Sequence, residues 1–400
     1  MFVGLFVGIW IARYLGPDGF GLLNFAIAFV ALFSPLADLG LQAVVVRELV
    51  KRPEDRAQIV ASALTLRLIG SIMAVLLVSA YVTLSRPDAA GRLVVIAVAL
   101  SLIPQSWDVI DFDYQSRMHA RPIVIIRTVS LLMFALVKVA LILSQADVLW
   151  FAAATTGEIA LSALCMRVLF DAELPSFSVS QASRLQMAQL LKSCWPLAIS
   201  SLSIVLYMRI DQVMIGEMLG HDGVGLFSAA VRVSEAWYFI PVAIATAISP
   251  ALTVAHATSK DDYGRKLLLS IRLLLGVSIA IAAPLTFWSD EVVALLYGPQ
   301  YLGAGAVLAI HAWAGVFASL GVAAGPWFVN EGLLKWRMWH TLIGASLNVL
   351  LNLVLVPRMG LSGAALATLV SYALAGFGFN ALTSRTMPIF LFQIRALSIK

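Results

Sequence analysis

Long, predominantly apolar segments recur from one end of this chain to the other. Examples are Ile59–Leu84, Ile123–Leu143 and Leu267–Trp288, each at or above the roughly 20 residues that a helix needs to cross a bilayer. Hydrophobic residues make up 61% of the chain and charged residues only 12%, whereas a water-soluble domain carries about 25% charged residues. Because backbone in lipid must satisfy its own hydrogen bonds, we expect an all-α, polytopic membrane protein rather than sheets or a soluble fold.

The apolar segments predict twelve membrane spans in two groups of six. Residues 1–170 form the predicted N-terminal bundle, and residues 196–400 the C-terminal bundle. Residues 171–195 between them form a cytoplasmic linker with an amphipathic stretch, Ala182–Lys192. The predicted spans are 2–15, 22–46, 59–84, 93–110, 122–144, 147–169, 196–215, 224–254, 267–288, 301–329, 336–356 and 361–384.

The Lys and Arg residues predict the orientation of these spans. With the N-terminus in the cytoplasm, most of the 27 Lys and Arg residues lie at cytoplasmic ends and loops. The outer side holds Arg13, Arg86, Arg92 and Arg358, and the spans themselves hold Lys138, Arg209 and Arg232. Basic residues concentrate in cytoplasmic loops of membrane proteins, so both termini are predicted to be cytoplasmic. The net charge of +5 then needs no nucleic-acid partner.

A short motif occurs twice, half a chain apart. Residues 15–22 read LGPDGFGL and residues 219–226 read LGHDGVGL, so six of eight positions agree. Each copy is predicted to lie in an outer loop that precedes a long span and then a charged cytoplasmic loop. The two halves therefore run in the same direction, as parallel repeats of secondary transporters do, with substrate expected between them. The motif itself is predicted to be a tight turn, with Asp18 and Asp222 as turn or cap residues.

Several stretches, taken in order, resemble the polysaccharide-exporter branch of the MOP superfamily, the Wzx-type flippases. They are ARYLGPDGFGLL (12–23), DLGLQAVVVREL (38–49), RIDQVMIGEMLG (209–220), VGLFSAAVRVSEAWYFIPVAIATAISPAL (224–252) and LLYGPQYLGA (295–304). The resemblance covers essentially the whole chain. It departs from the family at the N-terminus, where the leading segment is shorter than usual.

This resemblance implies both a fold and a function. The fold would be two six-helix bundles around a V-shaped cavity. The protein would move oligosaccharides linked to undecaprenyl diphosphate across the bacterial inner membrane by alternating access, for O-antigen, capsule or exopolysaccharide. The expected partners are the lipid-linked oligosaccharide, the bilayer, a polysaccharide polymerase and a chain-length regulator.

Charged residues inside the spans are the candidate site, because such residues are costly in a membrane and face protein or water. Arg suits a diphosphate, since its fork holds two phosphate oxygens. The substrate-binding candidates are Arg209, Lys138, Arg232, Arg13 and Arg47, and the ion-coupling or pairing candidates are Asp211, Glu235, Asp38 and Glu158.

Each candidate also has a simpler structural explanation. Arg209 and Asp211 lie about 200° apart on a helix and can each pair with a neighbouring helix. Arg232 and Glu235 share a face and can form their own ion pair. Arg13 and Arg47 can be interfacial anchors. Lys138 has no acid at three or four residues' distance, and Glu158 is its nearest candidate partner by sequence.

Other functions have weaker support in the sequence. Asp111-Phe112-Asp113 is the one string typical of an enzyme, a metal-dependent glycosyltransferase or polymerase. The five His residues lack metal-ligand spacing. No nucleotide-binding motif, metal site or cofactor is predicted, so the protein is expected not to be an enzyme, with H⁺ or Na⁺ as its possible coupling ion. A lipid II flippase and a MATE-type drug exporter are the nearer alternatives; the latter would need acidic groups in its cavity.

Overall fold

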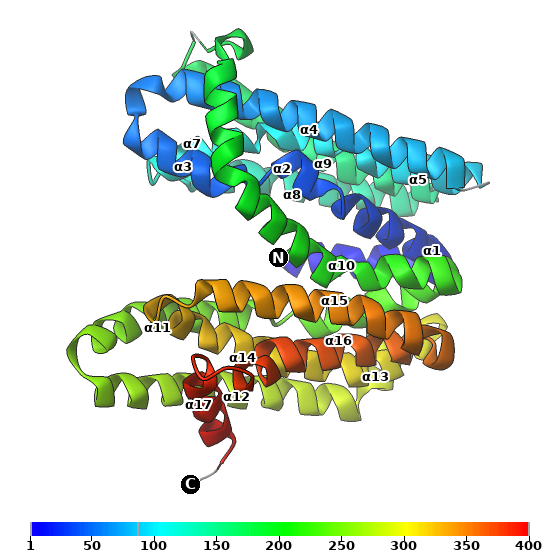
Figure 1. Ribbon diagram of the computed structural model, residues 1–400. Helices are drawn as coiled ribbons and strands as arrows, with labels where there is room; N and C mark the ends of the chain where they lie inside the picture. Colours follow the sequence, from blue (N-terminus) through cyan, green and yellow to red (C-terminus); the bar gives the residue numbers. More distant parts are fainter. Residues whose placement is uncertain (1, 86–87, 176, 399–400) are drawn as a thin grey trace. The chain divides into compact units, whose positions relative to one another are not determined.

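The computed structural model describes residues 2–85, 88–175 and 177–398 (Figure 1). Within these residues the structure is helical and contains no strand, so the predicted all-α class is confirmed. Arg86 and Lys400, which the charge analysis assigned to the outer and cytoplasmic sides, lie outside the described residues.

The helices follow one another with short connections. Their bounds are α1 Phe2–Ala31, α2 Ser34–Asp38, α3 Leu41–Lys51, α4 Arg56–Ser85, α5 Ala89–Ala99, α6 Leu102–Gln105, α7 Val109–Ser116, α8 Arg121–Leu143, α9 Val148–Glu173, α10 Arg184–Glu235, α11 Phe239–Thr258, α12 Lys260–Phe287, α13 Ser289–Tyr297, α14 Gly305–Asn330, α15 Leu334–Met359, α16 Leu361–Gly376 and α17 Met387–Leu397. Short 3₁₀ turns precede α4 (Pro53–Asp55), α7 (Ser106–Asp108), α10 (Val179–Gln181), α14 (Pro299–Ala304) and α17 (Gly378–Ala381).

Ten continuous helical segments among the described residues are long and apolar enough to cross a membrane. Two of them contain a glycine with a non-helical backbone, Gly16 in α1 (φ 68°, ψ 176°) and Gly220 in α10 (φ 85°, ψ 179°). Division of these two segments at the glycines raises their number to twelve, the number that the sequence predicts, but the predicted span 22–46 is divided among the end of α1, α2 and α3. Gly16 and Gly220 occupy the same position of the repeated motif, where a positive φ is accessible to glycine at little cost.

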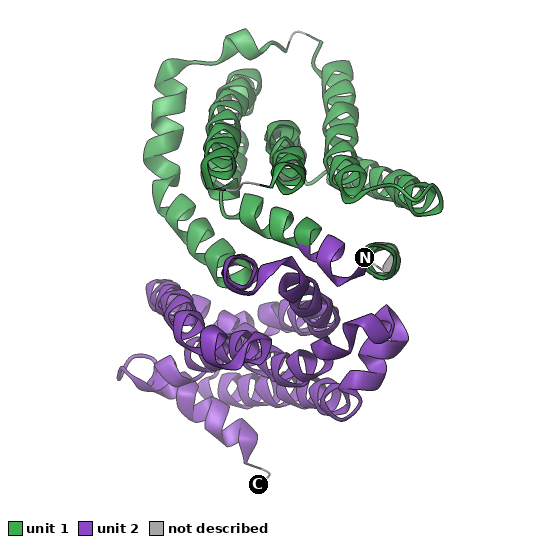
Figure 2. Ribbon diagram, turned by 90° about the vertical axis from the view of Figure 1, so that its right-hand side faces the viewer, with its two compact units in different colours: residues 1–15, 22–209 green, residues 16–21, 210–400 purple. Residues whose placement is uncertain are grey.

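The described chain forms two compact units (Figure 2). The first contains residues 1–15 and 22–209, and the second contains residues 16–21 and 210–400. The division falls inside α10, between Arg209 and Ile210. The bundle and linker boundaries predicted from the sequence follow the repeats and remain a prediction.

Each unit has its own apolar core. In the first unit, side chains from α3, α4, α7 and α9 meet, with Leu41, Ile59, Ile110 and Phe170 fully or almost fully buried. In the second unit the core comes from α11, α12, α14 and α17. The first core holds α3, α4 and α7 together, and these three helices carry most of the polar residues described below.

The two copies of the repeated motif contact each other within the second unit. A methyl group placed on Gly21 would lie 1.7 Å from the carbonyl oxygen of His221. A methyl group on Gly225 would lie 2.0 Å from the carbonyl oxygen of Pro17. The seventh residue of each copy thus packs on the third residue of the other, a reciprocal contact that leaves no room for a Cβ atom. The motif therefore marks a close helix contact as well as a turn.

Candidate polar cavity and charged clusters

A cavity of about 780 Å³ lies within the first unit and is called here the N-terminal cavity. Residues from α2, α3, α4, α7, α8, α10 and the 3₁₀ turn before α7 line it. Its lining combines charged and polar side chains with apolar ones: Asp38, Gly40, Leu41, Gln42, Ala43, Val46, Arg67, Asp108, Asp111, Phe112, Gln115, Arg127, Leu197, Ser200, Ser201 and Ile204. Its volume falls within the range of pockets that enclose small-molecule ligands, about 300–1,000 Å³.

Arg67 is the most buried charged residue of this cavity, with 2% of its surface exposed. Its Nη2 donates a hydrogen bond to Asp38 Oδ1, and its guanidinium lies 5.4 Å from the centre of the Phe112 ring. The buried Nε of Arg67 has no hydrogen-bond acceptor among the described residues. The guanidinium is thus held on two sides, and its unpaired Nε is buried.

Arg127 of α8 connects two further carboxylates of the cavity. Its Nη2 lies 3.1 Å from Asp108 Oδ1 and 2.9 Å from Asp111 Oδ2. Gln42 and Gln115 also line the cavity, and Gln42 Nε2 donates a hydrogen bond of 3.2 Å to Gln115 Oε1. The cavity thus has three carboxylates, two guanidinium groups and several neutral hydrogen-bonding groups.

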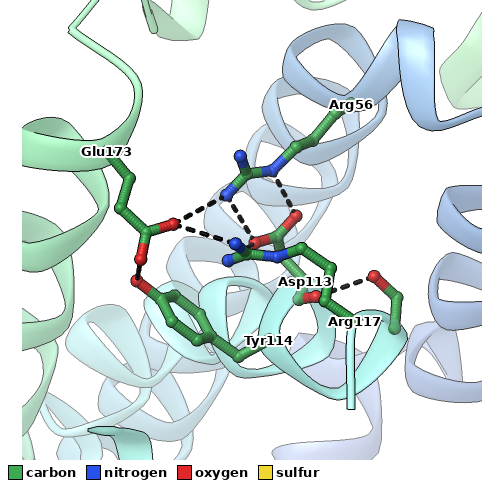
Figure 3. Close-up of polar contacts among 6 residues, drawn as sticks. Arg56, Asp113, Tyr114, Arg117 and Glu173 are labelled. Atoms are coloured by element: carbon green, nitrogen blue, oxygen red, sulfur yellow. Dashed lines mark hydrogen bonds and ion pairs between the residues drawn. The ribbon is translucent and has the colours of Figure 1, made fainter. Parts of the chain in front are cut away.

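A separate network joins the ends of α4, α7 and α9 (Figure 3). Asp113 accepts two hydrogen bonds from Arg56, at 2.6 and 2.8 Å, and one from Arg117 at 2.7 Å. Glu173 lies 3.4 Å from Arg56 and 3.0 Å from Arg117 and accepts a hydrogen bond from the Tyr114 hydroxyl. The two acids and the two arginines neutralise one another. Because they come from different helices, their contacts hold the ends of α4, α7 and α9 together.

These contacts give a structural role to the Asp-x-Asp string. Asp113 is 1% exposed and points into the network with Arg56 and Arg117, whereas Asp111 pairs with Arg127 at the N-terminal cavity. The two carboxylates therefore have different arginine partners. Groups of three or more His, Cys, Asp or Glu side chains suited to a metal are absent from the described residues.

Lys138 and Glu158, two of the sequence-predicted candidates, form an ion pair. Lys138 Nζ of α8 lies 2.8 Å from Glu158 Oε2 of α9, and both side chains are largely buried. Neither residue lines the N-terminal cavity. Glu158 is the partner that the sequence suggested for Lys138.

Asp211 and Arg209 lie in different surroundings although a single residue separates them. Asp211 is 7% exposed and belongs to the second unit. Its carboxylate accepts hydrogen bonds from Asn352 Nδ2 (2.6 Å) and Thr368 Oγ1 (2.5 Å). No basic side chain pairs with Asp211 among the residues that the structure describes. Arg209 is half-buried and ends the first unit.

The remaining candidates are distributed over both units. The Arg232 guanidinium lies 5.1 Å from the centre of the Phe20 ring, and Glu235 is half-buried at the end of α10. Arg13 lines a lateral groove of about 380 Å³ between α1 and α8, beside Trp10 and Tyr14. Arg47 is exposed and lies 3.2 Å from its neighbour Glu48. Of the candidates, Asp38 alone lines the N-terminal cavity.

Sequence reasoning missed most charged residues of the cavity: Arg67, Asp108, Asp111 and Arg127. It assigned Arg67 and Arg127 to the cytoplasmic ends as orientation signals. A signal was nevertheless present, because Arg67 lies well inside the apolar segment Ile59–Leu84 and Asp108 is three residues before Asp111 on the same helical face.

Comparison with known families identifies the kind of protein to which this architecture belongs. A family model described as "Polysaccharide biosynthesis protein" matches residues 1–256, more than half of the chain. The chain belongs to this polysaccharide biosynthesis family. A second model, described as MatE, matches residues 196–354.

Two curated relatives of this chain come from the archaeon Haloferax volcanii. The probable low-salt glycan biosynthesis flippase Agl15 is 29% identical over 181 residues, which cover 44% of this chain and 37% of the relative. The probable flippase AglR is 26% identical over 192 residues, or 46% of this chain and 38% of the relative. The matches thus span less than half the length of these relatives.

Solved structures with the same fold cover nearly the whole chain. An inward-facing multidrug resistance MATE family transporter of the MOP superfamily aligns with a TM-score of 0.76 at 15% identity, over 99% of this chain and 94% of that one. The lipid II flippase MurJ in an inward closed conformation aligns with a TM-score of 0.74 at 14% identity, over 99% and 89%. At these identities the likeness establishes the MOP transporter fold, as the sequence predicted.

Proposed function

We propose that this protein is a transporter, not an enzyme, and that it flips a lipid-linked glycan across a membrane. The observation that carries the proposal is the N-terminal cavity, which has five charged side chains in its lining within a bundle of apolar helices. The polysaccharide biosynthesis family match and the flippase relatives support it. In a membrane, buried charge of this kind is costly and marks a path for a polar substrate.

The proposed movement is alternating access. The polar headgroup enters the protein while the lipid chain stays in the bilayer, and the bundles rearrange to expose it on the other side. The proposed substrate is an oligosaccharide on undecaprenyl diphosphate in a bacterial inner membrane, with both termini of the protein in the cytoplasm. A polysaccharide polymerase and a chain-length regulator are the proposed partners that receive the product.

Asp211 is proposed as the ion-coupling residue. It is a carboxylate buried in a predicted span with neutral partners, and the nearby Asn352 Oδ1 and Ser371 Oγ are buried without a hydrogen-bond partner among the described residues. Oxygen atoms of this kind bind hard cations, and a carboxylate can instead take up a proton. Replacement by Asn should remove the dependence of transport on an H⁺ or Na⁺ gradient, measured in proteoliposomes with either gradient imposed.

The test of the proposed function is rescue of a bacterial strain that lacks its own flippase. The parent protein should restore surface glycan, and Arg127→Ala should not, because it leaves Asp108 and Asp111 without their shared partner. Arg265→Ala is the matched control: its side chain is 81% exposed and pairs only with Asp262. Failure of the parent to rescue in hosts that supply several lipid-linked glycans would contradict the proposal.

A MATE-type exporter of organic cations is a second candidate, favoured by the carboxylates Asp38, Asp108 and Asp111 in the cavity. It predicts that expression raises resistance to cationic drugs without restoring glycan. A lipid II flippase predicts instead that the protein sustains growth when the host's lipid II flippase is depleted.

A further inference from the structure

We propose that the N-terminal cavity holds uncharged or amine-bearing sugars of the glycan, and that it rejects both sugars with carboxylate groups and the diphosphate itself. This inference rests on the proposed function and adds to it the class of sugar and the part of the substrate that this cavity receives. It follows from the balance of charge in the lining, the atoms that remain free to bind, and the size of the cavity.

The charge balance is unfavourable to anions. Asp38, Asp108 and Asp111 supply three carboxylates, whereas Arg67 and Arg127 supply two guanidinium groups. Both arginines are already engaged, Arg67 with Asp38 and Arg127 with the other two acids. An anionic ligand would have to compete with these carboxylates for the arginines and would then lie beside them, a like-charge arrangement that binding sites use to exclude wrong partners.

The atoms that remain free suit hydroxyl groups. Asp38 Oδ1 accepts a hydrogen bond from Arg67 and Asp108 Oδ1 accepts one from Arg127, whereas Asp111 Oδ2 forms an ion pair with Arg127. The other oxygen of each carboxylate takes part in none of these contacts. A carboxylate accepts hydrogen bonds and donates none, so it binds a sugar hydroxyl or an ammonium group. Such charge-assisted hydrogen bonds are stronger than those between neutral groups.

The neutral lining completes a surface for a sugar. The Gln42 and Gln115 amides offer both donors and acceptors, and the Ser200 and Ser201 hydroxyls belong to α10 on another side of the lining. A volume of about 780 Å³ exceeds what a single ion needs and falls in the range for ligands of several rings or groups. The cavity therefore matches a short segment of glycan.

The diphosphate then needs a different contact. Arg47 directly follows the lining residue Val46 on α3, its side chain is exposed, and its contact is with the adjacent Glu48. Because Arg47 is outside the cavity lining, it can bind phosphate without bringing the phosphate beside the three carboxylates. This assigns to Arg47 the phosphate contact that the sequence suggested and separates it from the sugar site.

The experiment compares two probes that differ in one group. Both are farnesyl diphosphates that carry a disaccharide with the same first sugar and linkage. The terminal sugar is glucose in one and glucuronic acid in the other, so CH₂OH is exchanged for carboxylate. Dissociation constants are measured on the purified full chain in nanodiscs, with farnesyl diphosphate alone as the reference. We expect the glucose probe to bind at least about tenfold more tightly than the glucuronic acid probe.

Variants test whether the cavity causes the preference. Asp111→Asn and Gln42→Lys should each bring the ratio of the two dissociation constants toward one, the first by removal of a negative charge and the second by addition of a positive charge at an exposed lining position. Asp262→Asn removes an acid of the second unit that pairs with Arg265 and Lys266 and lies outside the cavity lining, so it should leave the ratio unchanged. Arg47→Ala should weaken both probes equally.

The outcomes separate the two proposals. Equal binding of both probes, each tighter than that of farnesyl diphosphate alone, overturns the sugar selectivity and leaves the flippase proposal in place, as does tighter binding of the glucuronic acid probe. A ratio that does not respond to Asp111→Asn or Gln42→Lys overturns the assignment to this cavity. Binding of both probes no tighter than that of farnesyl diphosphate alone contradicts both proposals.

Discussion

At the scale of single residues, Asp113 is the carboxylate whose removal should lower the stability of the protein most. It is 1% exposed and bonded to Arg56 and Arg117. Removal of one member of a buried ion pair costs about 3–5 kcal/mol, because the other charge stays buried without a partner. We therefore expect Asp113→Asn to lower the Tm of the detergent-solubilised protein strongly, as measured by differential scanning fluorimetry.

The control for Asp113 is Asp262, which also contacts two basic side chains, Arg265 and Lys266, but at the surface. Exposed ion pairs contribute little to stability. Asp262→Asn should therefore leave Tm nearly unchanged. A comparable fall in Tm for both variants would show that burial is not what makes Asp113 important.

The ion pair between Lys138 and Glu158 permits a different test, because the sequence predicts that Lys138 contacts the substrate. If Lys138 serves to neutralise Glu158, either single change, Lys138→Met or Glu158→Gln, leaves one charge unpaired within the spans and destabilises the protein. The double variant should recover most of the lost Tm and the transport rate. Recovery of Tm without recovery of transport would instead support a direct contact of Lys138 with substrate.

At the scale of elements, the reciprocal contact of the repeated motif is the feature most sensitive to a small change. Gly21→Ala and Gly225→Ala each place a methyl group within about 2 Å of a backbone oxygen, at 1.7 and 2.0 Å respectively. Overpacking of this kind typically costs about 1–3 kcal/mol or forces the helices apart. Both variants should lower Tm and transport.

Gly276 is the matched control for these glycines. It lies in α12, and nothing is within 4 Å of a Cβ atom built there. Gly276→Ala should be neutral or slightly stabilising, since alanine favours a helix by about 1 kcal/mol over glycine. A fall in Tm at Gly276 as large as that at Gly21 would contradict the close-contact explanation.

At the scale of the whole molecule, the distribution of basic residues predicts the topology. With Cys165 and Cys194 replaced by Ser, single cysteines at Asp18 and Asp222 should react with an impermeant maleimide added to intact cells. Cysteines at Lys51 and Lys260 should react only after the membrane is opened, because positively charged loops stay in the cytoplasm. The four positions are exposed in the structure. Labelling of Asp18 and Asp222 on opposite sides would contradict the parallel repeat.

The sequence by itself determined the all-helical fold and the segments that are long and apolar enough to cross a bilayer, and it predicted the two-fold plan of the chain. It could do so because a bilayer imposes the length and composition of each span, and because Gly16 and Gly220 repeat the same turn at the same place in each half. These properties are local in the chain, so a single stretch of residues is enough to reveal them.

The tertiary structure decided which charged side chains meet. Arg67 pairs with Asp38, Arg56 with Asp113, and Asp211 with Thr368, all across long sequence separations. A helix that is apolar on every side does not reveal how it is rotated, so its sequence cannot show which polar residue faces a neighbour. Packing fixes that rotation, and for this reason the sequence identified charges within spans but only Asp38 of those lining the cavity.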